Sequence, residues 1–263
     1  MPSTALGFTL LLATATCVIS LIASMILAAI DKRAERILNR EIIQSDEGVR
    51  LKDATNFKSE FWMLSIICVS FYLTIFPFIA LGSKFFQQKW GYSADEADFI
   101  NSLVYIISAI SSPFIGLLVD GVGRNMVFLL VASVLVVIAH LLMAVSYIML
   151  WFPIITLGIG YSIMCSALWP LVAIVVPQNQ LGTAYGVMQA IQNLGLAIAA
   201  NLTGMIVDWK GYITVEMFYV LWVSISVIFA LILMVQDHIR DGLLNKSAQQ
   251  RNALMAPTTT SYP

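Results

Sequence analysis

FWMLSIICVSFYLTIFPFIALG, residues 61–82, is an apolar run of 22 residues that contains no charged side chain. About 20 apolar residues are needed for an α-helix to cross the roughly 30 Å hydrocarbon core of a bilayer. At that depth each backbone amide must be hydrogen-bonded within its own segment or in a closed barrel, and a continuous run lacks the alternation of a barrel strand. The segment is therefore predicted to be a transmembrane helix.

Comparable runs recur along the chain and predict seven spans. They cover residues 8–30, 60–82, 97–119, 125–147, 152–176, 183–207 and 213–235. Composition agrees, since 59% of the residues are apolar and 11% are charged, against about 45–50% and about 25% in soluble domains. The predicted fold class is all-α, a polytopic transmembrane helical bundle of about seven spans embedded in the lipid bilayer. The sequence has no basic patch of the kind that would indicate a nucleic acid partner.

Basic residues predict which ends of the spans face the cytosol, because cytosolic loops are enriched in Lys and Arg. Eleven basic residues lie on one side of the predicted membrane: Lys32, Arg33, Arg36, Arg40, Arg50, Lys52, Lys58, Arg124, Arg240, Lys246 and Arg251. Three lie on the other side: Lys84, Lys89 and Lys210. The first side is therefore predicted to be cytosolic.

This topology divides the chain into four segments. Residues 1–30 are read as a first transmembrane helix rather than a signal peptide, because no basic residue precedes the apolar run and DKRAER follows it directly. Residues 31–59 are predicted to be a cytosolic connection between bundles, in which AERILNREII has the pattern of a short amphipathic surface helix. Residues 60–235 are predicted to form a six-helix bundle, and residues 236–263 a disordered cytosolic tail.

The segment GLLVDGVGR, residues 116–124, lies at the predicted cytosolic turn between the third and fourth spans. Its spacing is Gly-x-x-x-Asp-x-x-Gly-Arg. Gly116 permits close helix contact, and Asp120 suits a neighbouring helix N-terminus. Gly123 allows a tight turn, and Arg124 can pair with a carboxylate. Together the four residues are predicted to act as a gating motif; the alternative is an ordinary charged hairpin.

Polar side chains recur on single faces of several spans at the 100° helical period, which indicates a polar surface inside the bundle. Buried amides and hydroxyls face either a water-filled path or another helix, and the sequence leaves both alternatives open. The predicted substrate-lining residues are Trp169, Tyr72, Tyr105, Asn101, Gln189 and Gln192. The rings can stack on a ligand, and the amides can hydrogen-bond to it. A small-residue ridge at Gly182, Gly186 and Ala190 is predicted to let helices approach closely.

No enzyme pattern is found in the sequence. It has no Ser/His/Asp arrangement, P-loop or HExxH motif, and His140 and His238 lack metal-ligand spacing. We therefore expect no catalytic residue, metal or cofactor. His140 is expected to be a hydrogen-bonded structural histidine, and Glu216 an interfacial charge near the luminal start of the last span.

The gating motif resembles the loop signature of the major facilitator superfamily, which occurs between helices two and three and recurs between helices eight and nine. The resemblance implies that the seven spans correspond to helices six to twelve, the C-terminal half of that fold. Four further segments resemble the lysosomal dipeptide transporters of the superfamily: FWMLSIICVSFYLTIFPFIALG, INSLVYIISAISSPFIGLLVD, CSALWPLVAIVVP and QLGTAYGVMQAIQNLGLAI.

What this second resemblance implies is a multi-pass lysosomal membrane protein that exports dipeptides, notably cationic ones, as a uniporter. It also implies a glycosylated lysosomal membrane protein as accessory subunit. The first five helices and an N-terminal sorting signal have no counterpart in the sequence. Two other functions are therefore weighed: a truncated, non-transporting or regulatory half, and a seven-helix receptor, which the position of the long cytosolic loop after the first span disfavours.

Overall fold

The computed structural model describes residues 2–37 and 51–255, which divide into two units, Met1–Glu47 and Gly48–Pro263. Seven described helices are long and apolar enough to cross a membrane, as the sequence predicts. The seven long helices are α1 (Pro2–Ile37), α2 (Ser59–Trp90), α3 (Ala94–Val122), α4 (Asn125–Val145), α5 (Trp151–Val175), α6 (Leu181–Lys210) and α7 (Tyr212–Ile239). The shorter elements are η1 (Leu51–Asn56), η2 (Gln178–Gln180) and α8 (Ala248–Met255).

The described residues of the first unit form helix α1. Its candidate span is Gly7–Ala34, which contains the predicted span, and none of its most apolar stretch is buried within the unit. The helix continues to Ile37, so it takes in the start of the predicted amphipathic segment AERILNREII. The rest of that segment lies outside the described residues.

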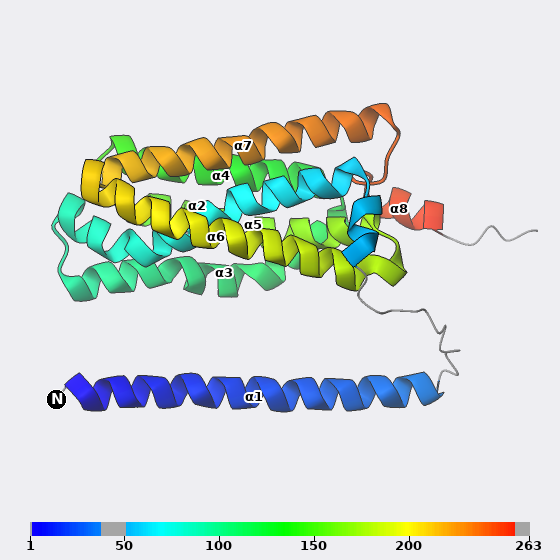
Figure 1. Cartoon of the computed structure of the whole chain (residues 1–263), viewed down its shortest axis with the longest axis horizontal. Helices are drawn as coiled ribbons and strands as arrows, with labels where there is room; N and C mark the ends of the chain where they lie inside the picture. Colours follow the sequence, from blue (N-terminus) through cyan, green and yellow to red (C-terminus); the bar gives the residue numbers. More distant parts are fainter. Residues whose placement is uncertain (1, 38–50, 256–263) are drawn as a thin grey trace, which may run out of the picture. The chain divides into compact units, whose positions relative to one another are not determined.

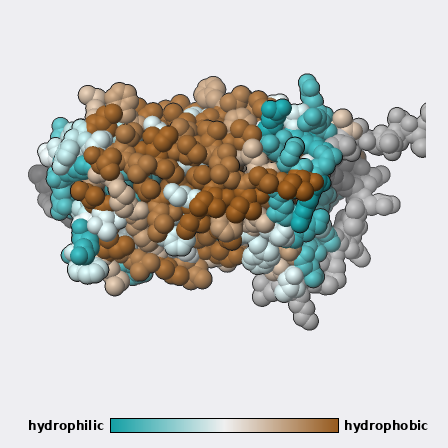
Figure 2. All heavy atoms as spheres, turned by 90° about the horizontal axis from the view of Figure 1, so that it is seen from above, coloured by the Kyte–Doolittle hydropathy of each residue, from teal (hydrophilic) through white to brown (hydrophobic). Residues whose placement is uncertain are grey.

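The second unit is a bundle in which the long helices run side by side (Figure 1). Helix α5 packs against α3 and α4, whereas α2 packs against α6 and α7. Aromatic rings of α2 fill much of the core, because Phe61, Phe71, Phe78 and Phe86 are all buried. The face in Figure 2 carries a broad hydrophobic band between two hydrophilic ends. This is the surface expected of a bundle that crosses a bilayer.

Local sequence explains where the helices on the predicted luminal side begin and end. Gly91 closes α2 in the left-handed conformation, with φ 74°, which glycine adopts without steric cost. Ser93 then caps α3 in a capping box, because its hydroxyl accepts a hydrogen bond from Glu96 N while the Glu96 carboxylate accepts one from Ser93 N. Gly211, with φ 80° and ψ 178°, separates α6 from α7 in another backbone conformation that favours glycine.

Close approach of helices occurs at glycines of α5. A Cβ at Gly158 would lie 3.0 Å from the side chain of Ile107 on α3, and a Cβ at Gly160 would lie 2.9 Å from Val136 on α4. By contrast, a Cβ at Gly182 or Gly186 would meet open space in the structure. The ridge predicted at residues 182–190 is therefore not a helix contact within the described part of the chain, and the contact is made by α5 instead.

The C-terminal segment also differs from the prediction. Helix α7 extends to Ile239, past the predicted boundary at residue 236, and α8 follows within the tail. The physical reason is a set of hydrogen bonds from residues 242–251 to the bundle, which composition alone does not reveal. Residues 256–263 lie outside the described part of the chain.

Candidate functional site

Aromatic side chains from α2, α5 and α6 gather in the second unit. The aromatic cluster, as we call it, consists of Tyr72, Phe76, Tyr161, Trp169 and Tyr185. Tyr72 stacks on Phe76 with ring centroids 5.8 Å apart, and it lies 6.1 Å from Tyr161 and 6.5 Å from Trp169. Tyr185 lies 6.0 Å from the Trp169 ring and donates its hydroxyl hydrogen bond to the Trp169 carbonyl at 3.1 Å.

Helical spacing explains why these rings meet. Tyr161, Cys165 and Trp169 are four residues apart on α5 and so share one face. The same four-residue spacing places Tyr72 and Phe76 on one face of α2. Tyr72 is buried, whereas the other four rings of the cluster are only half-buried. The cluster is therefore anchored at Tyr72 and accessible at its edge.

Polar groups tie the cluster to its neighbours. The Tyr72 hydroxyl lies 3.3 Å from Cys165 Sγ, and Cys68 Sγ donates to Gln192 Oε1 at 3.5 Å. Gln192 is 6% exposed, so this amide is buried at the contact between α2 and α6. Among the described residues, no group of three or more His, Cys, Asp or Glu side chains forms a potential metal site.

The structure brings two of the six predicted lining residues together, Trp169 and Tyr72, in the aromatic cluster. Gln192 accepts from Cys68, which is one helical turn from Tyr72 on α2. Asn101 instead donates from Nδ2 to the Ile79 carbonyl at 2.8 Å, so part of its hydrogen-bonding capacity joins α3 to α2. Tyr105 is 45% exposed, and Gln189 is also exposed. Phe76 and Tyr161 were not among the predicted lining residues. Each shares a helical face with one that was, because Phe76 follows Tyr72 by one helical turn and Tyr161 precedes Trp169 by two.

The gating motif forms the turn between α3 and α4. Gly123 closes α3 with φ 70°, as expected of a glycine in a tight turn, and Arg124 precedes α4 with φ 51°. A Cβ at Gly116 would meet open space, so the predicted close helix contact is not found there. Asp120 and Arg124 are exposed, and neither makes an ion pair within the described ranges. Their charges are therefore available to a partner surface.

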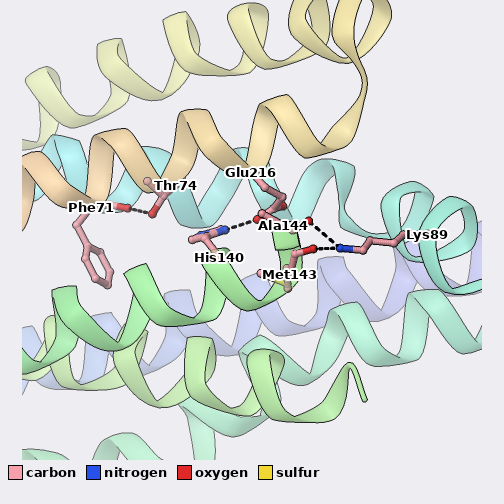
Figure 3. A network of polar contacts seen from close by, with 7 residues as sticks. All are labelled: Phe71, Thr74, Lys89, His140, Met143, Ala144 and Glu216. Carbon is pink, nitrogen blue, oxygen red and sulfur yellow. Dashed lines mark hydrogen bonds and ion pairs between the residues drawn. The ribbon is translucent and has the colours of Figure 1, made fainter. Parts of the chain in front are cut away.

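A buried polar pair joins α4 to α7 (Figure 3). His140 Nδ1 lies 2.7 Å from Glu216 Oε2, with side-chain exposures of 0% and 2%. Phe78 approaches the His140 ring edge-to-face with centroids 5.2 Å apart. His140 is thus hydrogen-bonded, as predicted, but the interpretation of Glu216 as an interfacial charge is wrong. The side chain turns inward because α4 offers it a partner 76 residues away in the sequence.

Lys89 lies at the same end of the bundle. Its ammonium group donates to the carbonyl oxygens of Met143 and Ala144 in the last turn of α4 (Figure 3). A cation at a helix C-terminus is favourable, because the last carbonyls of a helix have no intrahelical partner. Lys89 also lies over the Trp90 ring, 4.8 Å from its centroid. The side chain therefore fastens α2 to α4 at the predicted luminal end.

Comparison with known proteins places this fold in a family. The Major Facilitator Superfamily profile matches residues 62–260, which is most of the chain. The chain belongs to the major facilitator superfamily. Membership confirms the predicted family and a partial major facilitator helical bundle as the fold class. It also identifies the chain as part of a transporter family, which sets aside the receptor alternative.

Individual superfamily members are similar over nearly the whole chain. The human "Lysosomal dipeptide transporter MFSD1" is 45% identical over 251 residues, which are 95% of this chain and 54% of the human protein. The Danio rerio protein of the same name is 44% identical over 254 residues, which are 97% of this chain and 55% of that protein. The Gallus gallus protein is 46% identical over 249 residues, 95% of this chain and 56% of that protein. The chain thus spans about half the length of these relatives.

Proposed function

We propose that this chain supplies part of a transporter that carries dipeptides, notably cationic ones, from the lysosomal lumen to the cytosol. The observation that carries the proposal is the roughly 45% identity, over 95% of the chain, to proteins named as lysosomal dipeptide transporters. Within the superfamily fold, the seven spans would be helices six to twelve. Residues 31–59 would then be the cytosolic connection between two bundles, and the C-terminal tail would also be cytosolic.

The aromatic cluster supports a role in substrate binding. An aromatic ring face attracts a cation, and the attraction is strongest at Trp and where water is excluded. Half-buried rings at Tyr161 and Trp169 offer such faces, while the buried Tyr72 holds them in place. The same faces accept apolar side chains, so the cluster suits the side-chain end of a dipeptide.

The proposed mechanism is alternating access as a uniporter. Two bundles would rock around a site near the membrane midplane, so that the site opens to one side at a time. In this chain the aromatic cluster would be that site, and Asp120 and Arg124 would pair with a facing bundle on the cytosolic side. Gln189, Tyr105 and Asn101 would line the path beside the cluster. No step calls for a catalytic residue, a metal or a cofactor.

Partners follow from the same proposal. We propose a glycosylated lysosomal membrane protein as the accessory subunit, together with the lipid bilayer in which the seven spans lie. The alternative function is a non-transporting or regulatory half. The experiment below separates the two functions.

The test is uptake of a tritiated lysine-containing dipeptide into proteoliposomes that hold the chain, with and without the accessory glycoprotein. We expect saturable uptake, and Trp169→Ala to reduce it about tenfold or more, because a desolvated cation–π contact contributes about 2 kcal/mol and every 1.4 kcal/mol is a factor of ten. Trp209→Ala is the matched control, since this ring is 79% exposed at the end of α6 and lies outside the cluster.

Three results would count against the proposal in different ways. Equal uptake by Trp169→Ala and Trp209→Ala would remove the aromatic cluster from the substrate path. If Trp169→Ala lowers the uptake of neutral and cationic dipeptides alike, the cluster packs against the apolar part of the dipeptide rather than attracting its charge. Absence of uptake by the folded chain, with and without the accessory glycoprotein, would favour the non-transporting half.

A further inference from the structure

The chain reverses direction directly after α7, and a buried carboxylate fixes the reversal. Asp237, which is 8% exposed, accepts hydrogen bonds from Leu244 N at 3.1 Å and from Asn245 N at 3.0 Å. Gly242 N donates to the Asp237 carbonyl at 2.8 Å, and a Cβ at Gly242 would collide with the Asp237 carboxylate. The Asp237 carboxylate and the absence of a side chain at Gly242 therefore fix the path of residues 242–245.

The returning segment crosses the turn of the gating motif. Arg124 N donates to the Lys246 carbonyl at 3.1 Å, and Gly123 and Ser247 form an antiparallel bridge. A Cβ at Gly123 would lie 2.8 Å from Ser247 C and 2.9 Å from the Lys246 carbonyl oxygen. Gly123 is thus required twice, once for its positive φ and once for the approach of this segment.

A helix then anchors the segment to the bundle. Ser247 caps α8, because its hydroxyl accepts from Gln250 N at 3.3 Å while its own N–H donates to Gln250 Oε1 at 3.0 Å. Arg251 Nη2 donates to Asn125 Oδ1 at 2.9 Å, and Asn125 Nδ2 donates in turn to the Ala167 carbonyl on α5 at 3.4 Å. Residues 241–255, which we call the C-terminal strap, therefore connect the end of α7 to the α3–α4 turn and to α5.

The end of α7, where the chain reverses, is also fixed to the bundle. Arg240 Nη1 and Glu60 Oε1 form an ion pair of 2.5 Å, which joins the end of α7 to the first turn of α2. The strap thus starts from a point fixed to two helices. It then meets the α3–α4 turn, which carries Arg124 and, one helical turn earlier, Asp120. The charged groups of these two residues have no ionic partner in the described residues.

We propose that the C-terminal strap is a positioning element for the gating motif, and that it holds the α3–α4 turn so that Asp120 and Arg124 face their partner surface during the conformational step of transport. The assignment of a transport step rests on the proposed function. The position of the turn does not, because it follows from the contacts of Gly123, Arg124 and Asn125 with the strap. Arg251 and Asn125 are the positioning residues.

Two readouts on the full chain in lipid nanodiscs and proteoliposomes test the proposal. The first is the electron paramagnetic resonance spectrum of a spin label at Gly121→Cys, a site with open space beside the motif, in a background with Cys17, Cys68 and Cys165 replaced by Ala. We expect a label whose motion is restricted by an ordered backbone, and a more mobile one after Arg251→Ala or Asn125→Ala. Lys246→Ala is the control, since it removes only the 3.1 Å pair between Lys246 and Asp241 within the strap.

The second readout is dipeptide uptake by the same variants in the background with the natural cysteines. We expect Arg251→Ala to lower the maximal rate about tenfold, the effect of losing a hydrogen bond to a charged group, with an unchanged half-saturating dipeptide concentration. Asn125→Ala should have a similar effect, and the double variant should be no worse than either single variant. Lys246→Ala should leave both quantities unchanged.

Each possible result tests a separate part of the proposal. A label equally immobile in Arg251→Ala, Asn125→Ala and Lys246→Ala would overturn the positioning of the turn. A mobile label with unaltered uptake would overturn its role in transport, as would a change confined to the half-saturating concentration. If no form of the chain takes up dipeptide, the proposed function fails, and the label alone then decides whether the strap positions the motif.

Discussion

Replacing Glu216 with leucine is expected to destabilise the folded bundle by about 1–3 kcal/mol, because it leaves the buried His140 ring without its hydrogen-bond partner. His140 has no exposed surface, and Nδ1 would lose its hydrogen-bond partner at 2.7 Å. Nε2 of the same ring already has no partner in the structure. The histidine would then be a buried ring with neither nitrogen satisfied, which is costly in hydrocarbon or protein.

The measurement is the unfolding free energy of the chain in bicelles, followed by tryptophan fluorescence. Ser226→Ala is the matched control, because Ser226 and Ser133 also join α7 to α4 through a buried hydrogen bond, of 2.9 Å, without a charge. That control should cost about 0.6 kcal/mol, the average for hydrogen bonds between membrane helices.

The double variant His140→Phe/Glu216→Leu removes both partners and keeps the volume apolar. Replacing both partners of a buried hydrogen bond with apolar groups of the same shape can be nearly neutral. We therefore expect the double variant to recover most of the loss seen in Glu216→Leu. Two results would show that the pair is not a coupled unit. One is a double variant whose loss of unfolding free energy is the sum of the losses of the two single variants. The other is a loss for Glu216→Leu no larger than that for Ser226→Ala.

Most of the fold follows from the sequence because the bilayer imposes it. A run such as residues 61–82 has one way to satisfy its backbone in hydrocarbon, so its helix could be predicted without knowledge of its neighbours. The turns at Gly91 and Gly123 are equally local, since glycine adopts a positive φ without steric cost. The exact ends of the helices, the helix α8 and the sites of close helix approach required the structure.

The partners of the polar residues could not be predicted in this way. Glu216 and His140 are 76 positions apart, and Gln192 and Cys68 are 124 apart, so these contacts depend on which helices are neighbours. Asn101 shares a helical face with Tyr105, yet it bonds to a carbonyl of α2 while the tyrosine is exposed. Helical periodicity groups residues on one face, but it does not say what covers that face.

The C-terminal segment was misjudged for a related reason. Its composition is polar, and composition is the usual sign of a disordered tail. The hydrogen bonds that order residues 242–251 are made with Asp237, Arg124 and Asn125. Asp237 belongs to the tail, but Arg124 and Asn125 lie far from it in the sequence and could not be identified from the tail alone. Short polar segments next to a membrane bundle can thus be ordered by the loops that they meet.

Leucine at Gly160 or Gly158 is expected to prevent assembly of the second unit. Helix α5 lies between α3 and α4, and Gly158 and Gly160 are where it approaches each of them. A Cβ alone would lie 3.0 Å from Ile107 or 2.9 Å from Val136, and the backbone oxygens of Val104 and Ala132 lie just beyond, at 3.3 and 3.2 Å. Three further carbon atoms cannot be fitted without separating the helices.

Overpacking of this kind typically costs about 1–3 kcal/mol and occasionally more, and here backbone stands behind the side chain that would have to move. We expect Gly158→Leu and Gly160→Leu to abolish the monodisperse peak of the detergent-solubilised chain in size-exclusion chromatography.

Gly182→Leu and Gly186→Leu are the matched controls, and they carry the sharper argument. Both sites are on α6, face open space in this chain, and should gain about 0.8–1 kcal/mol of intrinsic helix propensity. If they are neutral or stabilising while Gly158→Leu and Gly160→Leu fail, helix contact rather than glycine content explains the loss. If Gly182→Leu instead lowers stability in the membrane, that face of α6 is covered there, and the ridge predicted from the sequence packs against a surface outside the described chain.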